Sequence, residues 1–255
     1  MDQRMNPTPE LAWAAGLFDG EGSVSTYVPR HRRSPRRQMQ ISQAGPPGKK
    51  PLVLVRFQEI VGGLGNITGP YRGYLYYWKI TKKDEVDEVG DLLWPYLGQE
   101  KRRQFATAAL RITRTTPGPV ESPHLPDPIL EASWAAGLFD GERTISLVRR
   151  PPRREPAGVA MSLPQASSSG VPEKLLRFRA AVAGVGGIGG PYAPRSPWPR
   201  LPHYQWATGD RHKVTTVARI LWPSLGAIKR RSLSAAATFL DPDFQEWSAG
   251  RIQSG

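Results

Sequence analysis

The sequence contains no cysteine and only four histidines among its 255 residues. The absence of cysteine excludes disulfide bonds, structural cysteine–zinc sites and thiol nucleophiles. The four histidines are not closely spaced, which argues against a histidine-based metal site. The chain also lacks an apolar run as long as a membrane span, and its first ten residues lack the apolar segment of a signal peptide. We expect a soluble globular protein without a membrane partner, cytoplasmic or nucleoid-associated, or organellar in a eukaryotic host.

Acidic residues are few relative to basic ones. The chain has 35 Lys and Arg against 22 Asp and Glu, which gives a net charge of +13 and a pI near 10.3. Residues 1–116 carry +7 and residues 117–255 carry +6. The charge therefore belongs to both halves of the chain and not to a basic tail. This balance favours a polyanionic partner over a small acidic metabolite.

The sequence repeats itself once. Residues 12–21 read AWAAGLFDGE and residues 133–142 read SWAAGLFDGE, at an offset of 121. At the same offset, VRFQEIVGGLGNITGPY at 55–71 matches LRFRAAVAGVGGIGGPY at 176–192. Two units of this size indicate a duplication, whereas a solenoid needs three or more short repeats. We predict a first repeat over 1–112, a Pro-rich linker over 113–127, a second repeat over 128–240 and a tail over 241–255.

Hydrophobic periodicity within each repeat changes between helical and strand-like. In the first repeat it predicts a helix, two strands, a helix, two more strands and two closing helices. The predicted ranges are 9–20, 22–29, 36–43, 51–61, two short strands around 69–70 with the second over 75–81, 83–93 and 101–113. We therefore predict an α+β fold of two tandem αββαββα units, each with one four-stranded antiparallel sheet.

The repeated helix carries a stripe of small residues at helical spacing, formed by Ala12, Ala15, Gly16 and Asp19. Such a stripe allows two helix backbones to approach closely, so the two copies should pack side by side about a pseudo-two-fold axis. The larger side chains of Trp13, Leu17 and Phe18 are expected to face the sheet of their own unit. Both helices would then end at the same level and bring Glu21 and Glu142 together.

Two adjacent carboxylates at helix C-termini are electrostatically unfavourable, because they repel each other and oppose the helix dipole. A single Asp-Gly-Glu is more simply read as a helix terminus with a Gly cap. Its recurrence within ten matching positions favours a functional role instead. A divalent cation removes the repulsion, and Mg²⁺ accepts one or two carboxylates together with phosphate oxygens and waters. The pair therefore indicates metal-assisted phosphodiester hydrolysis.

The segments WAAGLFDGEG at 13–22 and WAAGLFDGER at 134–143 resemble the two motifs of single-chain, two-repeat LAGLIDADG homing endonucleases. The resemblance extends over residues 7–240. It implies two saddle-shaped sheets lying on the DNA major groove and Mg²⁺-dependent cleavage of both strands, in the service of intron or intein homing. It further implies a monomer acting on a long, asymmetric double-stranded target, with Mn²⁺ supporting activity and Ca²⁺ supporting binding without cleavage.

Under this resemblance the metal is carried by the last acidic position of each motif, which is Glu21 in one repeat and Glu142 in the other. We expect Gly20 and Gly141, the residues that precede them, to belong to the same metal site.

Two further catalytic positions of the family can be placed in each repeat. The polar residue at the end of the second strand, which helps to position active-site water, matches Gln43 in MQISQA and Gln165 in MSLPQA. The active-site lysine after the WPxLG segment matches Lys101 and Lys229, where it could stabilise phosphate charge or polarise water. Without the family, each lysine would be read as a solvated residue that begins a basic helix.

Arginine-rich loops join the strands where the resemblance places DNA. RHRRSPRR at 30–37 has five arginines and VRRPPRR at 148–154 has four, so these loops are candidates for phosphate contacts or simply solvated loops. The predicted DNA-binding residues are Ser23, Ser25, Tyr27, Arg30, Arg32, Arg33, Arg36, Arg37, Gln38, Gln40, Asn66, Thr68, Arg72, Tyr77, Lys79, Thr144, Ser146, Arg150, Arg153, Arg154, Ser162, Arg195 and Gln205.

The two repeats differ at several of these places. Gly22 is replaced by Arg143, which would be strained if the backbone there required a positive φ. Pro164 replaces Ser42 and removes a strand donor beside Gln165. On the presumed DNA face, polar residues are replaced by smaller ones: Gln40 by Ser162, Asn66 by Gly187, Thr68 by Gly189 and Lys79 by Ala207. We expect an asymmetric target that the first repeat reads more strongly.

Two functions remain open. The first is a site-specific double-strand DNA endonuclease. The alternative is an RNA-splicing maturase, or a DNA-binding protein without cleavage, on the same scaffold. The joint presence of all six catalytic candidates favours the enzyme, because paired carboxylates near phosphate weaken binding when no metal is bound.

Overall fold

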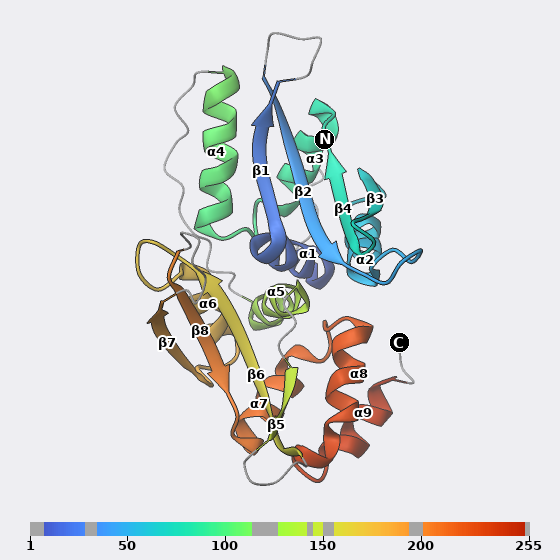
Figure 1. Cartoon of the computed structure of the whole chain (residues 1–255), viewed down its shortest axis with the longest axis vertical. Coiled ribbons are helices and arrows are strands. Elements are labelled where there is room, and N and C mark those ends of the chain that lie inside the picture. Colours follow the sequence, from blue (N-terminus) through green and yellow to red (C-terminus); the bar gives the residue numbers. More distant parts are fainter. Residues whose placement is uncertain are drawn as a thin grey trace. The chain divides into compact units, whose positions relative to one another are not determined.

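The computed structural model describes residues 8–28, 35–113, 127–141, 145–149, 156–193 and 201–252. The chain forms two compact units, Met1–Gly141 and Glu142–Gly255, and each contains one four-stranded antiparallel sheet (Figure 1). The helices and strands follow one another as αββαββα with extra closing helices in both repeats, which confirms the predicted α+β fold. Among the described helices, none has both the length and the hydrophobicity needed to cross a lipid bilayer.

The first unit begins with helix α1 (Pro9–Glu21). Thr8 caps its N-terminus by accepting a hydrogen bond from the Leu11 backbone N–H at 3.2 Å, and Pro9 occupies the first helical position. The helix continues one residue beyond the predicted end and includes Glu21. Gly22 follows with φ −77° and ψ 158°, so its backbone does not require a left-handed conformation.

The sheet of the first unit has the order β1-β2-β4-β3, from β1 (Gly22–Tyr27), β2 (Arg36–Ala44), β3 (Asn66–Tyr71) and β4 (Leu75–Ile80). Its inner face is fully apolar at the centre and packs against helices. Helices α2 (Leu52–Ile60), α3 (Lys83–Leu93) and α4 (Gln99–Thr113) complete the repeat. Aromatic contacts join the layers, because Phe57 of α2 stacks on Phe18 and meets Trp78 edge-on at 4.7 Å.

Helix α5 (Pro128–Gly141) is the motif helix of the second repeat, but it belongs to the first unit because it packs along α1. The two backbones nearly touch. A Cβ added to Gly16 would lie 1.9 Å from the carbonyl oxygen of Trp134, and a Cβ added to Gly137 would lie 1.9 Å from that of Trp13. Only glycine allows this approach, which confirms the role predicted for the small-residue stripe.

The prediction that the larger side chains of α1 face the sheet of their own unit is wrong for Trp13. The Trp13 indole Nε1 donates to Asp140 Oδ2 of α5 at 2.8 Å, because a buried indole N–H needs a partner and finds it on the neighbouring helix. Leu17 also reaches α5, where its Cδ1 lies 3.3 Å from the place of a Gly141 Cβ. Phe18 does point into its own repeat, between Phe57 and Phe105.

The second unit repeats the sheet with the order β5-β6-β8-β7, from β5 (Ile145–Arg149), β6 (Pro156–Ala166), β7 (Gly187–Tyr192) and β8 (His203–Thr208). Helices α6 (Glu173–Ala181), α7 (Arg211–Leu221) and α8 (Ala227–Ala235) accompany it. Phe178 meets Trp206 edge-on at 4.8 Å, as Phe57 meets Trp78 in the first unit. The same core is therefore built twice.

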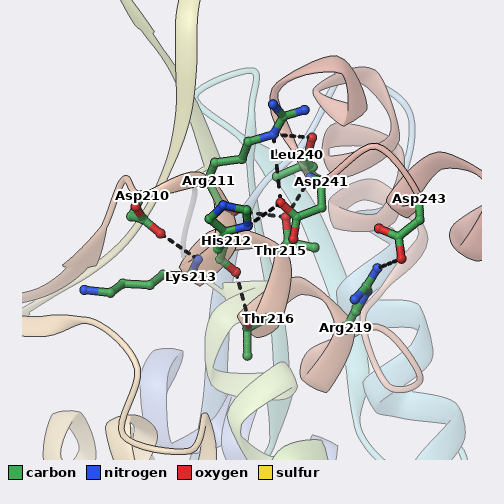
Figure 2. Close-up of polar contacts among 10 residues, drawn as sticks. All are labelled: Asp210, Arg211, His212, Lys213, Thr215, Thr216, Arg219, Leu240, Asp241 and Asp243. Carbon is green, nitrogen blue, oxygen red and sulfur yellow. Dashed lines mark hydrogen bonds and ion pairs between the residues drawn. The ribbon is translucent and has the colours of Figure 1, made fainter.

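A short 3₁₀ turn, η1 (Ala237–Phe239), and helix α9 (Phe244–Ile252) follow α8. Helix α9 lies in the segment 241–255, which was predicted to be a tail. The segment between them is bound to α7, as Figure 2 shows. Asp241 lies 2.7 Å from His212 Nδ1, Asp243 pairs with Arg219 at 2.6 Å, and Arg211 Nε donates to the Leu240 carbonyl at 2.6 Å. The rings of Phe244 and Trp247 in α9 pack against Trp222.

Candidate active site and nucleic-acid interface

The C-terminal ends of α1 and α5 meet. Glu21 is the last residue of α1 and Gly141 is the last residue of α5. A Cβ added to Gly141 would lie 2.7 Å from Glu21 Cγ and 3.4 Å from Glu21 Oε1, so the glycine leaves the space that the Glu21 side chain occupies. Gly20 packs on α5 near Leu138. Glu142 directly follows Gly141 and lies outside the described residues.

Gln43 lies at the same helix ends. Its Nε2 donates to the Gly141 carbonyl oxygen at 3.3 Å, although Gln43 comes from the first repeat and Gly141 from the second. The register explains its direction, because Gln43 follows the buried residues Met39 and Ile41 by alternation and shares their face of β2. In the second unit Gln165 takes the same place, paired across strands with Tyr204 as Gln43 is with Tyr76, and it is 8% exposed.

Lys101 is buried beside the end of α1. Its side chain is 4% exposed and its Nζ donates to the carbonyl oxygen of Gly22, the residue after Glu21. Lys229 is 7% exposed on α8. The simple reading of these residues as solvated lysines is therefore wrong, since a buried ammonium requires hydrogen-bond partners. The lysines are directed into the protein, while Arg103 of the same basic run remains exposed.

The oxygen atoms at the end of the helix pair are suitable ligands for a hard cation. Within the described ranges, no group of three or more His, Cys, Asp or Glu side chains is arranged to hold a metal ion. The end of the helix pair instead offers the Glu21 carboxylate and main-chain carbonyl oxygens, with position 141 shaped to admit the carboxylate. Mg²⁺ prefers oxygen ligands and retains several waters, so one or two carboxylates are sufficient for it. The residues present fit this ion.

The outer face of the first sheet is polar. The side chains that alternate with the buried residues are Ser23, Ser25, Tyr27, Arg36, Gln38, Gln40, Ser42, Asn66, Thr68, Tyr77 and Lys79. Contacts between strands confirm that they share one face: Gln38 donates to Ser25 at 2.9 Å, and Lys79 Nζ lies 5.8 Å from the centre of the Tyr27 ring. Ser42 is not among the predicted DNA-binding residues, although its alternation with Gln40 places it on this face.

The arginines near this sheet divide into two groups. Arg36 is on the outer face, opposite Tyr27, and Arg72 is exposed in the β3–β4 turn. Arg37 departs from the predicted DNA-binding set, because it lies on the inner face and forms an ion pair with Asp87 of α3. Its position between Arg36 and Gln38 in a strand requires this opposite orientation. Arg30, Arg32 and Arg33 lie outside the described residues.

The outer face of the second sheet has fewer polar side chains. Ser146, Ser162 and Gln205 are on it, and so is His203, which the sequence analysis missed although it alternates with Gln205. Small residues occupy most of the remaining positions: Gly158, Ala160, Gly187, Gly189 and Ala207. The predicted residues Thr144, Arg150, Arg153, Arg154 and Arg195 lie outside the described residues.

No protein-family model matches the sequence, and no curated protein sequence matches it. Solved structures do. The chain is similar to the LAGLIDADG homing endonuclease I-GzeII in complex with its DNA target, with a TM-score of 0.62, 13% identity and coverage of 96% of this chain and 97% of that chain. It is also similar to I-LtrWI bound to target DNA, with a TM-score of 0.58, 14% identity and coverage of 96% of each chain. A third similar structure is I-SmaMI bound to its uncleaved DNA target in the presence of calcium ions. Its TM-score is 0.53, its identity is 14%, and the match covers 98% of this chain and 100% of that chain.

These neighbours are single-chain LAGLIDADG homing endonucleases, and the alignments extend over nearly the whole of each chain. The protein therefore has the two-repeat LAGLIDADG fold. The sequence resemblance drawn from the two motifs and the structural similarity point to the same architecture.

Proposed function

We propose that this chain is a site-specific double-strand DNA endonuclease of the homing type. The observation that carries the proposal is the meeting of Glu21 with the end of α5, next to Gln43 and the buried Lys101. A helix pair that needs only stability has no reason to collect a carboxylate, an amide and an ammonium group at one end. The structural neighbours are endonucleases bound to DNA, which supports the same class of reaction.

In this proposal Glu21 and Glu142 hold divalent metal ions, with the main-chain oxygens of Gly20 and Gly141 nearby. Bound Mg²⁺ would supply an activated water and neutralise phosphate charge. The side-chain amide of Gln43 would orient water at the end of α5, and Gln165 has the matching role in the other site. Lys101 and Lys229 would stabilise the negative charge that develops on phosphate.

Double-stranded DNA is the proposed substrate, bound by the outer faces of the two sheets and by the arginine-rich loops. The net charge of +13 suits a phosphate backbone and predicts binding that weakens with salt. The outer face of the first sheet offers amide, hydroxyl and ammonium groups for base edges. We expect Mg²⁺ or Mn²⁺ to support cleavage and Ca²⁺ to support binding alone; a neighbour bound to uncleaved DNA with calcium ions agrees with this.

A randomised-site DNA library tests the proposal. With Mg²⁺ the protein should cut both strands of a small set of long sites, and Glu21→Gln should abolish cleavage of at least one strand. Binding in Ca²⁺ should survive or tighten in this variant, because a repulsive charge near phosphate is lost. Glu10→Gln is the matched control, since it changes an exposed glutamate at the other end of α1 and should leave cleavage unchanged.

Two results would overturn the assignment. If Glu21→Gln cuts both strands at the normal rate, Glu21 does not carry the metal. If the protein binds a defined DNA site but cuts nothing with Mg²⁺ or Mn²⁺, it is a binding protein on an endonuclease scaffold. Selective binding to a folded intron RNA would instead favour a maturase.

A further inference from the structure

Two tryptophans occupy the same place in the two repeats. Trp94 lies in LLWPYLG and Trp222 lies in ILWPSLG, at an offset of 128. Each tryptophan directly follows its helix, α3 in the first unit and α7 in the second. The main-chain carbonyl of each accepts a hydrogen bond from an arginine of the next helix, Arg102 at 2.7 Å and Arg230 at 3.0 Å. The surroundings of the two rings can therefore be compared position by position.

The two tryptophan rings differ in how far they are covered. Trp222 is 1% exposed, because the rings of Phe244 and Trp247 in α9 lie 5.7 and 5.9 Å from it. Trp94 is 38% exposed, and within the described ranges it meets a single aromatic ring, that of Phe105 at 6.2 Å. Helix α8 ends after 9 residues and the chain then returns to α7, whereas α4 continues for 15 residues. The first unit, as far as it is described, therefore has no helix in the place of α9.

The sequence of the linker does not suit this place. The residues that follow α4, TRTTPGPVESPHLPD at 113–127, contain four prolines and no aromatic residue. Proline interrupts helices, and a segment without aromatic side chains has no counterpart of Phe244 and Trp247. A helix that covers Trp94 as α9 covers Trp222 would therefore come from another molecule.

The charges beside the two tryptophans are opposite in sign. On α7, His212 and Arg219 each contact an aspartate of the segment that leads into α9, at 2.7 and 2.6 Å (Figure 2). The matching residues of α3 are acidic, since Asp84 corresponds to His212 and Asp91 corresponds to Arg219. Both aspartates are exposed, and neither forms an ion pair with any described residue. A helix that binds α3 therefore needs basic residues where the α9 segment has acidic ones.

We propose that Asp84, Asp91 and Trp94 form a docking face on α3 for a helix of another protein, with two aromatic residues one turn apart and basic residues beside them. The aromatic pair covers Trp94, and the basic residues pair with the two aspartates, which are about 10 Å apart along the helix. The chain as a whole has a charge of +13 and repels a basic helix, so binding depends on this local acidic face.

The docking face lies away from the polar outer face of the first sheet. Helix α3 packs on the inner face through Val86 and Val89, and its Asp87 pairs there with Arg37. A partner helix and a ligand of the outer face can therefore bind at the same time. The proposal does not depend on DNA cleavage.

A peptide derived from the α9 segment tests the proposal on the full chain in the absence of DNA. The labelled peptide has the sequence of residues 241–252 with Asp241→Lys and Asp243→Arg, and the control peptide has the unchanged sequence. Binding is measured by fluorescence anisotropy. The charge-reversed peptide should bind roughly 10-fold more tightly than the control, because like charges on the control peptide and α3 repel each other.

Two variants of the protein locate the binding. Trp94→Ala should weaken binding of the charge-reversed peptide by about 10- to 100-fold, since it removes the aromatic anchor. Tyr74→Ala is its matched control, because it removes a ring that is 52% exposed in the β3–β4 turn, and it should change nothing. Asp91→Arg should exchange the preference, so that the unchanged peptide binds more tightly than the charge-reversed one. Glu246→Arg makes the same charge change on the exposed side of α9 and should not alter the preference.

Several results would overturn the proposal. These are equal binding of the two peptides to the wild type, no binding of either, and an unchanged preference in Asp91→Arg. Binding that appears only when residues 114–126 are replaced by a Gly-Ser sequence would mean that the linker itself covers Trp94, and would also overturn it. Because the assay contains no DNA, its failure leaves the proposed endonuclease function intact.

Discussion

Trp13 of α1 donates its indole N–H to Asp140 of α5 at 2.8 Å, and Trp134 of α5 returns the same bond to Asp19 of α1 at 2.7 Å. Asp19 is 3% exposed and also accepts the backbone N–H of Gly98 at 2.8 Å. The three residues of the repeated Asp-Gly-Glu segment therefore differ in what they do. Its aspartate joins the two helices, its glycine allows close packing, and its glutamate lies at the helix end, where we propose that it holds a metal ion.

Trp134→Phe should lower the free energy of unfolding by about 1.5–3 kcal/mol, because it removes a hydrogen-bond donor to the buried carboxylate of Asp19. Trp222→Phe is the matched control. Trp222 is equally buried, but its Nε1 has no hydrogen-bond partner among the described residues. Guanidinium unfolding of both variants measures the difference. Equal losses in the two would show that ring volume, and not the bond to Asp19, determines the effect.

Gly137→Ala should be severely destabilising, by at least about 3 kcal/mol, since its new Cβ would lie 1.9 Å from a main-chain oxygen that cannot easily move. Gly16→Ala should have the same effect. Gly20→Ala should cost less, because its Cβ would meet the flexible end of Leu138 at 3.0 Å. Gly158→Ala is the control, with open space around the added methyl. Melting temperatures that fall equally for Gly137→Ala and Gly158→Ala would contradict the tight helix contact.

Much of the fold could be predicted because it depends on local periodicity. Alternation in 36–43 and helical spacing in 83–93 correspond to β2 and to α3, and the small-residue stripe located the α1–α5 contact. Helix α9 was not predicted. Its sequence has little helical periodicity, and its place depends on rings that pack against Trp222, a contact between residues distant in sequence.

The candidate site was predicted less completely, since direction and burial are tertiary properties. The run Lys101-Arg102-Arg103 has the appearance of a solvated surface, yet Lys101 is buried against a main-chain carbonyl. The size of Trp13 predicts that it faces its own sheet, but its indole N–H needs an acceptor and binds Asp140 of α5. Arg37 belongs by sequence to an arginine-rich loop, but strand alternation places it on the opposite face from Arg36.

Arg36 and Arg37 should respond differently to removal. Arg36→Ala should reduce the slope of log K for DNA against log salt by about one, as expected for one lost phosphate contact. Arg37→Ala should leave the slope unchanged and lower stability by less than about 1 kcal/mol, because it loses only the partly exposed pair with Asp87. Titrations at several salt concentrations measure both. A fall of the slope in Arg37→Ala would place this side chain on DNA.

The two strands of the target should be cut in sequence and not together. The second repeat has Arg143 where the first has Gly22, and Pro164 where the first has Ser42. Gly22 has a φ of −77°, so backbone strain is not the reason for glycine there; a Cβ would instead lie 2.4 Å from the ring of Phe18 and 2.5 Å from its carbonyl oxygen. Arg143 and Glu142 lie outside the described residues, and by analogy with Gly22 we expect the arginine to bring bulk and charge beside Glu142.

A misplacement of about 1 Å can cost roughly 100-fold in rate, so the crowded site should cut more slowly and nicked circles should accumulate from supercoiled plasmid. Arg143→Gly should shorten the nicked phase, whereas Arg143→Lys, which keeps bulk and charge, should preserve it. If Arg143 instead binds a phosphate of the DNA, Arg143→Gly will slow cleavage and weaken DNA binding. Simultaneous cutting of both strands in the wild type and in Arg143→Gly would mean that the differences between the two repeats do not affect catalysis.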